Sequence, residues 1–263
     1  MKKLVLLGCG KLNNIVADAL IEGLLPGYEA VGLYSRTQEK AEKLAGKMQE
    51  NGYVCRVCKD FQEVLDLSPD YIIEAASPAA VRETAVPALE KGISVVTLSI
   101  GALADDAFYE KIRQAALSGG ARLYVVSGAT GGFDVLQTAT LMGDAEACFF
   151  NEKGPDGLKG TQLYSDSLMS GQKEVFSGSA AEAIRILPTK VNVTVAASRA
   201  SVGPDKMKVT MLSTPGFKGD TQRVEIKNPQ VHAVIDVYSE TAAIAGWSVV
   251  NTLRNLESPV VFC

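Results

Sequence analysis

His232 is the only histidine in the chain, and histidine is the side chain that most readily moves protons near neutral pH. It lies in GDTQRVEIKNPQVHAVIDVYS, residues 219–239, which alternates apolar and polar side chains as two strands of a hairpin would. The face from which His232 projects therefore decides whether it can take part in catalysis. A second group of residues suited to chemistry lies at the start of the chain.

A glycine turn near the N-terminus predicts a dinucleotide site. LLGCGKLN follows the apolar run KLVLLG and gives Gly8-x-Gly10-x-x-Asn13, a GxGxxG fingerprint whose third glycine is replaced. The first two glycines allow a tight turn and close backbone approach to a pyrophosphate, while the next helix offers its amide donors. We expect Gly8, Gly10, Lys11, Leu12 and Asn13 at the cofactor. The plainer alternative is an ordinary strand–helix turn.

The end of the next expected strand indicates which dinucleotide binds. NAD-binding domains usually place Asp or Glu there, where the carboxylate accepts hydrogen bonds from the adenosine ribose. This chain instead has Ser35, Arg36 and Thr37, and an arginine attracts a 2′-phosphate that a carboxylate would repel. The sequence therefore predicts NADP as the preferred cofactor, with NAD as the alternative. Arg36 could also be a solvated residue at the start of a helix.

Alternating strands and helices must position these residues in the first half of the chain. Apolar runs predict strands at 3–8, 28–35, 53–57, 71–77, 93–99 and 122–128, and helical patterns lie between them at 14–25, 37–52, 61–65, 79–90 and 105–118. Such alternation predicts an α/β fold with a doubly wound parallel sheet, the Rossmann arrangement. We assign residues 1–123 to this dinucleotide-binding domain.

The pattern changes in the second half of the chain. Strands are expected at 148–153, 191–198, 206–214, 222–227 and 231–239, with few helices between them. This predicts a C-terminal α+β domain with a mixed or antiparallel sheet over 124–238, serving catalysis and oligomerisation. A last helix within 239–263 is expected to pack back on the body of the protein.

Composition excludes several classes of function. The formal net charge is −4 and no long block of Lys or Arg occurs, so we expect no nucleic-acid partner. The apolar run at the N-terminus is too short for a signal peptide, and nothing approaches the roughly 18 apolar residues of a membrane span, so a cytoplasmic protein is expected. Cys55 and Cys58 have CxxC spacing without a second pair, and we therefore expect structural cysteines and no metal site, with a redox role as the alternative.

Three longer stretches resemble the L-aspartate dehydrogenase family. These are YIIEAASPAAVRETAVPALEKGISVVTLSIGALAD, RLYVVSGATGGFD and FSGSAAEAIRILPTKVNVTVAA. The last is similar to that family's Gly-Ser-Ala-x-Glu-Ala … Pro-x-Asn-x-Asn-Val pattern. The resemblance covers nearly the whole chain and implies an NAD(P)-dependent oxidative deamination of L-aspartate to iminoaspartate, within NAD biosynthesis. By family analogy it also implies a homodimer.

The resemblance implies roles for further residues. Cofactor contacts carried over from the family fall on Ala75, Ala76, Ser77, Ser99, Gly101, Ala129 and Asn192. Substrate contacts fall on Ser127, Gly128, Thr130, Gly131 and Gly132. Small residues suit this region because the nicotinamide ring and the substrate Cα must come within hydride-transfer distance. The glycines could also form a turn where the chain crosses between domains.

The family's proton-handling histidine, which lies in an Arg-Asn-x-His stretch, falls on Gln222 in this chain. If QRVEI and VHAVI pair around KNPQ, Ile226 faces Val231 and Gln222 lies on the face opposite His232. We therefore expect His232 to be a bystander. Glutamine hydrogen bonds but does not exchange protons near pH 7.

Lys190 replaces the family's first Asn in Pro-x-Asn-x-Asn and becomes the leading candidate for proton transfer, provided that burial lowers its pKa. It could equally clamp an anion or face solvent. Asp134 is a weaker candidate. Ser239-Glu240-Thr241 replaces the family's Pro-Lys-Thr, which weakens the assignment of aspartate as substrate.

Two functions follow from these departures. The first is an NADP-dependent amino-acid dehydrogenase in which Lys190, Asn192 and Gln222 orient a small amino-acid or keto-acid substrate. The second is a catalytically altered or inactive protein of the same fold that binds NADP(H).

Overall fold

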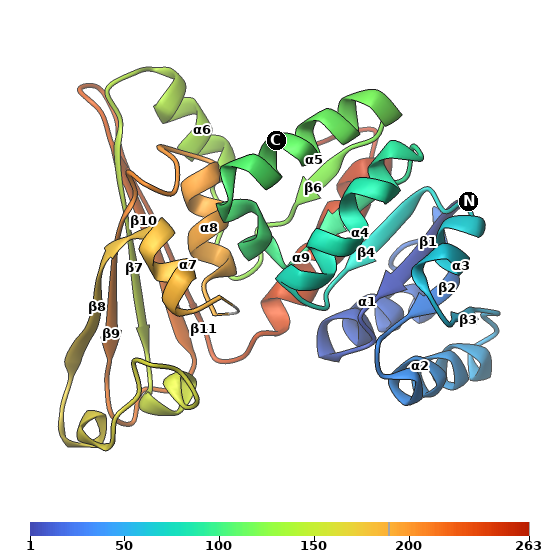
Figure 1. Ribbon diagram of the computed structural model, residues 1–263, viewed down its shortest axis with the longest axis horizontal. Helices are drawn as coiled ribbons and strands as arrows, with labels where there is room; N and C mark the ends of the chain where they lie inside the picture. Colours follow the sequence, from blue (N-terminus) through green and yellow to red (C-terminus); the bar gives the residue numbers. More distant parts are fainter. Residues whose placement is uncertain (189, 263) are drawn as a thin grey trace. The chain divides into compact units, whose positions relative to one another are not determined.

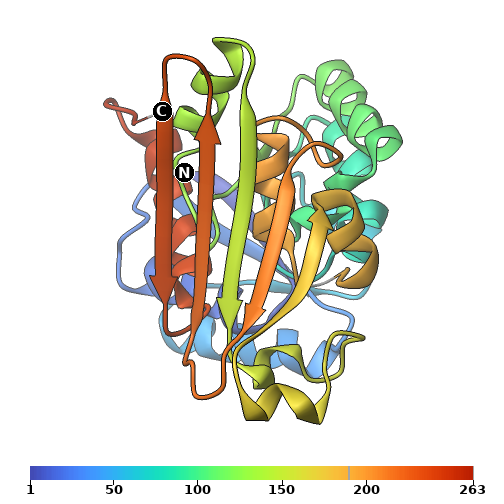
Figure 2. The same ribbon diagram turned by 90° about the vertical axis from the view of Figure 1, so that its left-hand side faces the viewer.

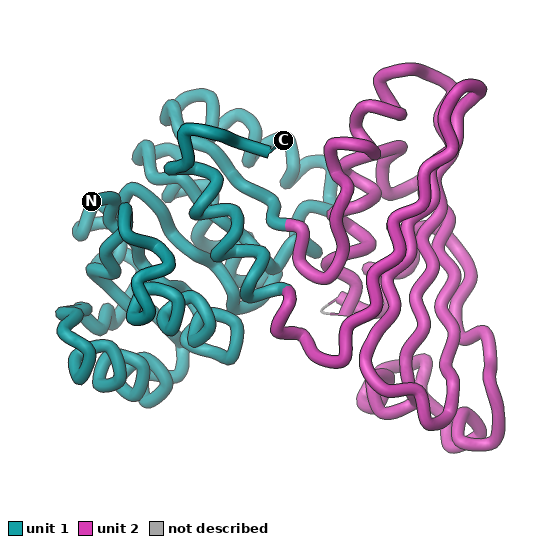
Figure 3. The backbone as a smooth tube through the Cα atoms, turned by 180° about the vertical axis from the view of Figure 1, so that it is seen from behind, with its two compact units in different colours: residues 1–126, 245–263 teal, residues 127–244 magenta. Residues whose placement is uncertain are grey.

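Two compact units make up the protein. The structure is a computed structural model that describes residues 1–188 and 190–262. Unit 1 combines Met1–Val126 with Ala245–Cys263, and unit 2 is Ser127–Ile244 (Figure 3). Most of the C-terminal helix therefore belongs to the unit that holds the N-terminus. Cys263, one of the cysteines expected to be structural, lies outside the described residues.

A six-stranded parallel sheet forms the centre of unit 1 (Figure 1). Its order is β3-β2-β1-β4-β5-β6, which is the order of a doubly wound dinucleotide-binding sheet. The strands are β1 (Lys2–Leu7), β2 (Tyr28–Tyr34), β3 (Arg56–Cys58), β4 (Tyr71–Glu74), β5 (Ser94–Thr97) and β6 (Leu123–Val125). The predicted Rossmann fold is confirmed.

Helices cover this sheet. They are α1 (Lys11–Ile21), α2 (Gln38–Glu50), α3 (Phe61–Asp66), α4 (Pro78–Glu90), α5 (Asp106–Gly119), the short 3-10 helix η1 (Ile100–Ala104) and the C-terminal α9 (Ala243–Glu257). Helices α1, α2 and α9 share one hydrophobic core with Leu4 and Leu6 of β1. Val5 and Leu7 point to the opposite face and are also buried. Burial of β1 on both faces explains its uninterrupted apolar sequence.

A five-stranded mixed sheet forms the centre of unit 2, in the order β11-β10-β7-β9-β8. Strands β7 and β9 are parallel and the other neighbours are antiparallel. The strands are β7 (Glu146–Lys153), β8 (Lys173–Ser179), β9 (Lys208–Ser213), β10 (Asp220–Lys227) and β11 (His232–Ser239). The helices are α6 (Phe133–Leu141), α7 (Ala180–Ile186), α8 (Asn192–Arg199), η2 (Pro155–Leu158) and η3 (Asp166–Ser170). The expected mixed sheet is confirmed.

The two faces of this sheet have different surroundings. Phe149, Met211 and Val224 project from one face into a hydrophobic core that also contains residues of α6, α7 and α8. Figure 2 looks onto the other face, which lies open over most of its extent. Alternation along each strand thus separates a buried apolar face from an accessible polar face.

The strand expected at 191–198 is wrong, because this segment forms helix α8. Its β-branched residues alternate in VNVTV, which is typical of a strand. In the folded unit, however, all residues from Thr194 to Ser198 are buried, a run that a helix enclosed on several sides accommodates. Tertiary packing has overridden the local preference here.

Strand β8 and helix α7 were not predicted, although the sequence carries a signal for α7. The Ser179 hydroxyl accepts a hydrogen bond from the Glu182 N–H, and the Glu182 carboxylate accepts one from the Ser179 N–H. This capping box follows from the S-x-x-E spacing and marks a helix start. None of the described helices is long and apolar enough to cross a membrane.

Candidate functional site

The glycine turn after β1 has the geometry of a pyrophosphate-binding turn. Gly8 has φ +91°, and a Cβ at this position would lie 2.8 Å from atoms of Ala76. At Gly10 a Cβ would meet nothing within 4 Å, so the backbone here faces open space. Gly10 is the N-cap of α1 and provides no side-chain hydrogen bond to the first turn. The N–H groups of that turn therefore stay available to an anion.

Asn13 explains how the turn works without its third glycine. Its side chain is fully buried, and its amide nitrogen donates to the carbonyl oxygens of Leu7 and Gly8 at 3.0 Å and of Ile73 at 3.1 Å. Asn13 thus braces the end of β1 against β4. We infer that the Asn13 side chain shapes the turn and does not contact a ligand. The predicted contact between Asn13 and a cofactor therefore concerns the Asn13 backbone alone.

A pocket of about 200 Å³ lies at the carboxyl ends of β1, β2 and β4. In a doubly wound sheet this is the edge at which ligands bind. The pocket brings together seven of the predicted cofactor residues: Gly8, Gly10, Ser35, Arg36, Thr37, Ala75 and Ala76. It also contains residues that the sequence did not point to: Leu7, Cys9, Tyr34, Lys40, Ala79, Ala80, Glu83 and Thr84.

The pocket carries two basic side chains beside β2. Arg36 and Lys40 are exposed, and neither forms an ion pair within the described part of the chain. Lys40 lies in the first turn of α2, and its spacing of four from Arg36 could have identified it. Glu83 of α4 supplies a carboxylate to the same pocket. β2 itself ends without one, at Tyr34.

The other residues predicted at the cofactor do not line this pocket. Lys11 and Leu12 form the first turn of α1, and Gly101 lies in η1. Ser77 caps α4 by accepting a hydrogen bond from the N–H of Ala80 at 3.2 Å. Ser99 is buried and bonded to a carboxylate within unit 1. Their contacts with a cofactor stay predictions.

The cysteines differ in accessibility. Burial raises the pKa of Cys9, in the glycine turn, to about 11. It has the same effect on Cys55, which donates to the carbonyl oxygen of Ala30 at 3.2 Å. Cys58 is buried, whereas Cys148 is exposed. The four described cysteines are free thiols, so the CxxC pair forms no disulfide.

In unit 2, Gln222 projects from the covered face of β10. It is 6 % exposed and stands next to Asn151 of β7 in the sheet register. Its side chain forms no hydrogen bond with any described residue. The amide of Asn151 instead donates to Asp220 and to the carbonyl oxygen of Thr221. The fully buried polar atoms without a partner among the described residues are Asn13 Oδ1, Thr130 Oγ1 and Ser213 Oγ, so the Gln222 amide is not fully enclosed and a ligand or water can reach it.

His232 lies on the opposite face, as predicted. The register pairs Ile226 with Ala233 and Lys227 with His232, so the expected pairing of Ile226 with Val231 is wrong by two residues. Asn228 and Val231 close the turn, because the N–H of Asn228 donates to the carbonyl oxygen of Val231. A shift of two keeps every side chain on its predicted face.

The His232 imidazole lies 2.8 Å from the Glu225 carboxylate and is largely exposed. Strand β10 therefore carries Gln222 on one face and the partner of His232 on the other. Within unit 2, His232 cannot act where Gln222 stands.

Lys190 is exposed, so unit 2 does not supply the burial on which its role as a base depends. Asn192 begins α8 and is partly buried. Asp134 is exposed in the first turn of α6. The roles of all three residues stay predictions.

The segment at 127–132 leads into α6. The N–H of Thr130 donates to the carbonyl oxygen of Ser127 at 3.2 Å, and Gly128 and Gly132 have positive φ. A Cβ at Gly132 would lie 2.6 Å from Ile235, so packing against β11 requires glycine there. Gly131 and Ala129 are partly buried between them. Such a turn is the alternative interpretation of these glycines from the sequence. Contacts between this segment and a substrate stay a prediction.

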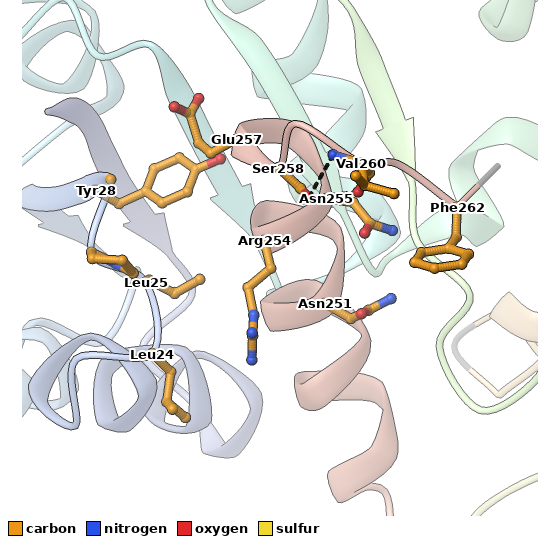
Figure 4. Close-up of a pocket in the computed structure, with 12 residues that line it drawn as sticks. Leu24, Leu25, Tyr28, Asn251, Arg254, Asn255, Glu257, Ser258, Val260 and Phe262 are labelled. Atoms are coloured by element: carbon orange, nitrogen blue, oxygen red, sulfur yellow. Dashed lines mark hydrogen bonds between the residues drawn. The ribbon is translucent and has the colours of Figure 1, made fainter.

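A second cavity in unit 1, of about 460 Å³, lies beside the end of α9 (Figure 4). Arg254 and the tail residues Val260 and Phe262 line it together with Tyr28, whose hydroxyl donates to the carbonyl oxygen of Leu253 at 2.8 Å. Tyr28 begins β2, at the edge of the sheet opposite the glycine turn. The cavity is therefore separate from the dinucleotide pocket.

A doubly wound parallel sheet with this glycine turn and a basic pocket at its carboxyl edge defines a dinucleotide-binding protein of the Rossmann class. The family model "Homoserine dehydrogenase, NAD binding domain" matches residues 8–126, and "Aspartate dehydrogenase, C-terminal" matches residues 134–256. The L-aspartate dehydrogenase of Methanococcus maripaludis is 30% identical over 270 residues, covering 99% of this chain and 98% of that protein. The chain belongs to the L-aspartate dehydrogenase family, whose members are oxidoreductases that act on the CH–NH2 group of an amino acid.

Further relatives agree with this assignment. The L-aspartate dehydrogenase of Cupriavidus necator is 28% identical, over 84% of this chain and 82% of that protein. Among solved structures, aspartate dehydrogenase from Thermotoga maritima has a TM-score of 0.79 at 24% identity and covers all of both chains. A hyperthermophilic archaeal homoserine dehydrogenase in complex with NADPH has a TM-score of 0.63 at 14% identity, over 99% of each chain. These structures share the fold.

Proposed function

We propose that this protein is an NADP-preferring dehydrogenase that oxidises L-aspartate, or a closely related amino acid, to the corresponding imine. Membership of the L-aspartate dehydrogenase family supports the reaction class. The basic pocket at the end of β2 supports the cofactor preference, and it is the observation that carries the proposal.

The residues of unit 1 fit a dinucleotide. The open space at Gly10 and the first turn of α1 would hold the pyrophosphate. Arg36 and Lys40, with the Thr37 hydroxyl beside them, would hold a 2′-phosphate. An NAD-selective pocket would instead need a carboxylate at the end of β2. When bound, the nicotinamide supplies the hydride acceptor.

On the substrate side, Gln222 would orient its ligand and not exchange protons. Its amide has both a donor and an acceptor to offer, and neither is used within the described part of unit 2. Because Lys190 is exposed, we expect it to act as a cation that attracts a substrate carboxylate and not as a base. Under this proposal, protons released by the amino group pass to water.

The experiment that tests the proposal is a spectrophotometric assay of the purified protein with L-aspartate and NADP⁺. We expect NADPH to form, and the reverse reaction with oxaloacetate, ammonia and NADPH to consume it. No turnover in either direction, with NADPH still bound, would contradict the enzymatic role. It would favour the second candidate, a nucleotide-binding protein of this family without catalysis, for which the glutamine at position 222, where the family has a histidine, is the supporting observation.

We also propose a homodimer that forms through the open face of the unit 2 sheet. Val234 and Tyr238 are 42% and 54% exposed on this face, although both are large apolar side chains. An interface between two copies of the chain would cover both side chains. A Val234→Asp substitution is expected to convert the dimer to a monomer in sedimentation experiments, whereas a wild-type monomer would contradict the proposal.

A further inference from the structure

Glu74 is a fully buried carboxylate that the proposed reaction does not use. It ends β4 and is 1% exposed. Its Oε1 accepts hydrogen bonds from the N–H of Ala76 at 2.8 Å, the N–H of Ser77 at 3.0 Å and the hydroxyl of Ser99 at 2.8 Å. Its Oε2 accepts from the hydroxyl of Thr97 at 2.7 Å and the N–H of Ser99 at 3.2 Å. Five donors thus converge on one side chain.

These donors come from two different segments of unit 1. Ala76 and Ser77 follow β4, whereas Thr97 ends β5 and Ser99 follows it. Both segments lie at the carboxyl edge of the sheet, where the dinucleotide pocket is. The Glu74 carboxylate therefore joins two neighbouring segments of that edge.

Ala76 connects the Glu74 carboxylate to the dinucleotide pocket. Ala76 lines the pocket and stands close to Gly8. A Cβ built on Gly8 would lie 2.8 Å from atoms of Ala76. Its N–H is held by Glu74. The position of the pocket wall opposite the glycine turn thus depends on the carboxylate.

Burial raises the pKa of the Glu74 carboxyl, and the hydrogen bonds from Thr97, Ala76 and Ser99 oppose that rise. Within the described part of the chain the carboxylate has no cationic partner. A buried carboxylate without a counter-charge is costly, whereas three of its five donors are backbone N–H groups that only an acceptor can satisfy.

We propose that Glu74 is a positioning residue for the cofactor. It fixes the segments after β4 and β5 to each other, so that they meet the dinucleotide as one rigid edge. The role is exerted through Ala76 and Ser99 and rests on the proposed dinucleotide-binding function.

Glu74→Gln tests this role with almost no change of shape. The amide must turn its NH2 group toward at least one backbone N–H, which breaks the set of five acceptor contacts. We expect the Kd for NADPH, measured by fluorescence titration well below the unfolding temperature, to rise about tenfold. Thr97→Val removes a single donor and is expected to raise the Kd a few-fold.

Glu63→Gln is the matched control. Glu63 also lies in unit 1 and accepts a backbone N–H, from Lys59 at 2.8 Å, and it pairs with Arg56, but it is not part of the pocket. Both Glu→Gln variants are expected to lower Tm, and only Glu74→Gln to raise the Kd. If both lower Tm while the Kd stays at the wild-type value, Glu74 has only a structural role.

Thr97→Val decides the question if Glu74→Gln does not fold. An unchanged Kd in folded Thr97→Val would then overturn the inference. Wild-type protein that binds neither NADPH nor NADH would overturn the proposed function and the inference together. Wild-type binding with an unaltered Kd in Glu74→Gln overturns the inference alone.

Discussion

At the residue scale, the central feature is the division of roles across β10. His232, the side chain best suited to proton transfer, is exposed and paired with Glu225. Gln222 occupies the buried face with an amide that has no partner among the described residues. Because glutamine does not titrate near pH 7, Gln222 can contribute to catalysis only by orienting the substrate.

Gln222→His is therefore expected to add acid–base catalysis. A positioned general acid or base typically contributes about 10²–10⁴-fold, so we expect L-aspartate turnover to increase by about 10². The rate of the variant should also acquire a dependence on pH near the pKa of histidine. Gln222→Asn, which keeps an amide, serves as the control. A Gln222→His rate equal to wild type would show that the position does not contact the reacting groups.

The thiols give a prediction that depends on pH. Burial raises the pKa of Cys9 to about 11, so at neutral pH this thiol is almost entirely protonated. Its alkylation by iodoacetamide should accelerate about tenfold for each pH unit between roughly 7 and 10, because only the thiolate reacts. In the monomeric Val234→Asp variant, exposed Cys148 should react before Cys9, and NADPH should protect Cys9 alone, since Cys9 lines the pocket. Peptide mass spectrometry measures both sites, and equal rates at neutral pH would contradict the burial.

At the scale of elements, the turn between β1 and α1 combines two different requirements for glycine. Gly8 needs its positive φ and the absence of a Cβ against Ala76, whereas Gly10 leaves a Cβ free space. The first is a requirement of the fold and the second a requirement of the ligand.

Substitution by alanine should separate these requirements. Gly8→Ala is expected to lower the free energy of unfolding by at least about 1–2 kcal/mol, from the left-handed backbone alone, and to abolish cofactor binding. Gly10→Ala should keep the wild-type Tm and still weaken NADPH binding, because its methyl group enters the ligand's space. Thermal unfolding and fluorescence titration of both variants test this. A Gly10→Ala protein that binds NADPH like wild type would place the pyrophosphate elsewhere.

Elements with a single strong signal could be predicted from the sequence. Buried parallel strands such as β1 read as uninterrupted apolar runs, and the face of Gln222 followed from alternation even though the hairpin register was shifted by two. Helix α8 could not be predicted, because its VNVTV pattern favours a strand until packing encloses it. Lys40 could have been found from its spacing of four from Arg36, whereas Glu74 depends on segments that meet only in the folded unit, so spacing along the chain gives little sign of its role.

At the scale of the whole molecule, the residues expected to bind the dinucleotide phosphates lie in unit 1. The final helix returns to this unit, and Val249 and Leu253 join the core formed by α1 and α2. Unit 2 carries Gln222 on β10, Asn192 at the start of α8 and Lys190 in the turn before that helix. Cofactor affinity should therefore respond to substitutions around the carboxyl edge of the parallel sheet, and Gln222 substitutions should affect turnover with little effect on the Kd for NADPH.

The most direct measurement of the central claim is a paired titration of the protein with NADPH and NADH. We expect NADPH to bind at least about tenfold more tightly than NADH. Arg36→Ala and Lys40→Ala should each raise the Kd for NADPH by about tenfold and leave the Kd for NADH unchanged. Arg56→Ala, an arginine of unit 1 outside the pocket that pairs with Glu63, should leave both affinities at wild-type values. Equal affinity of the wild-type protein for NADPH and NADH would contradict the proposed preference for NADP.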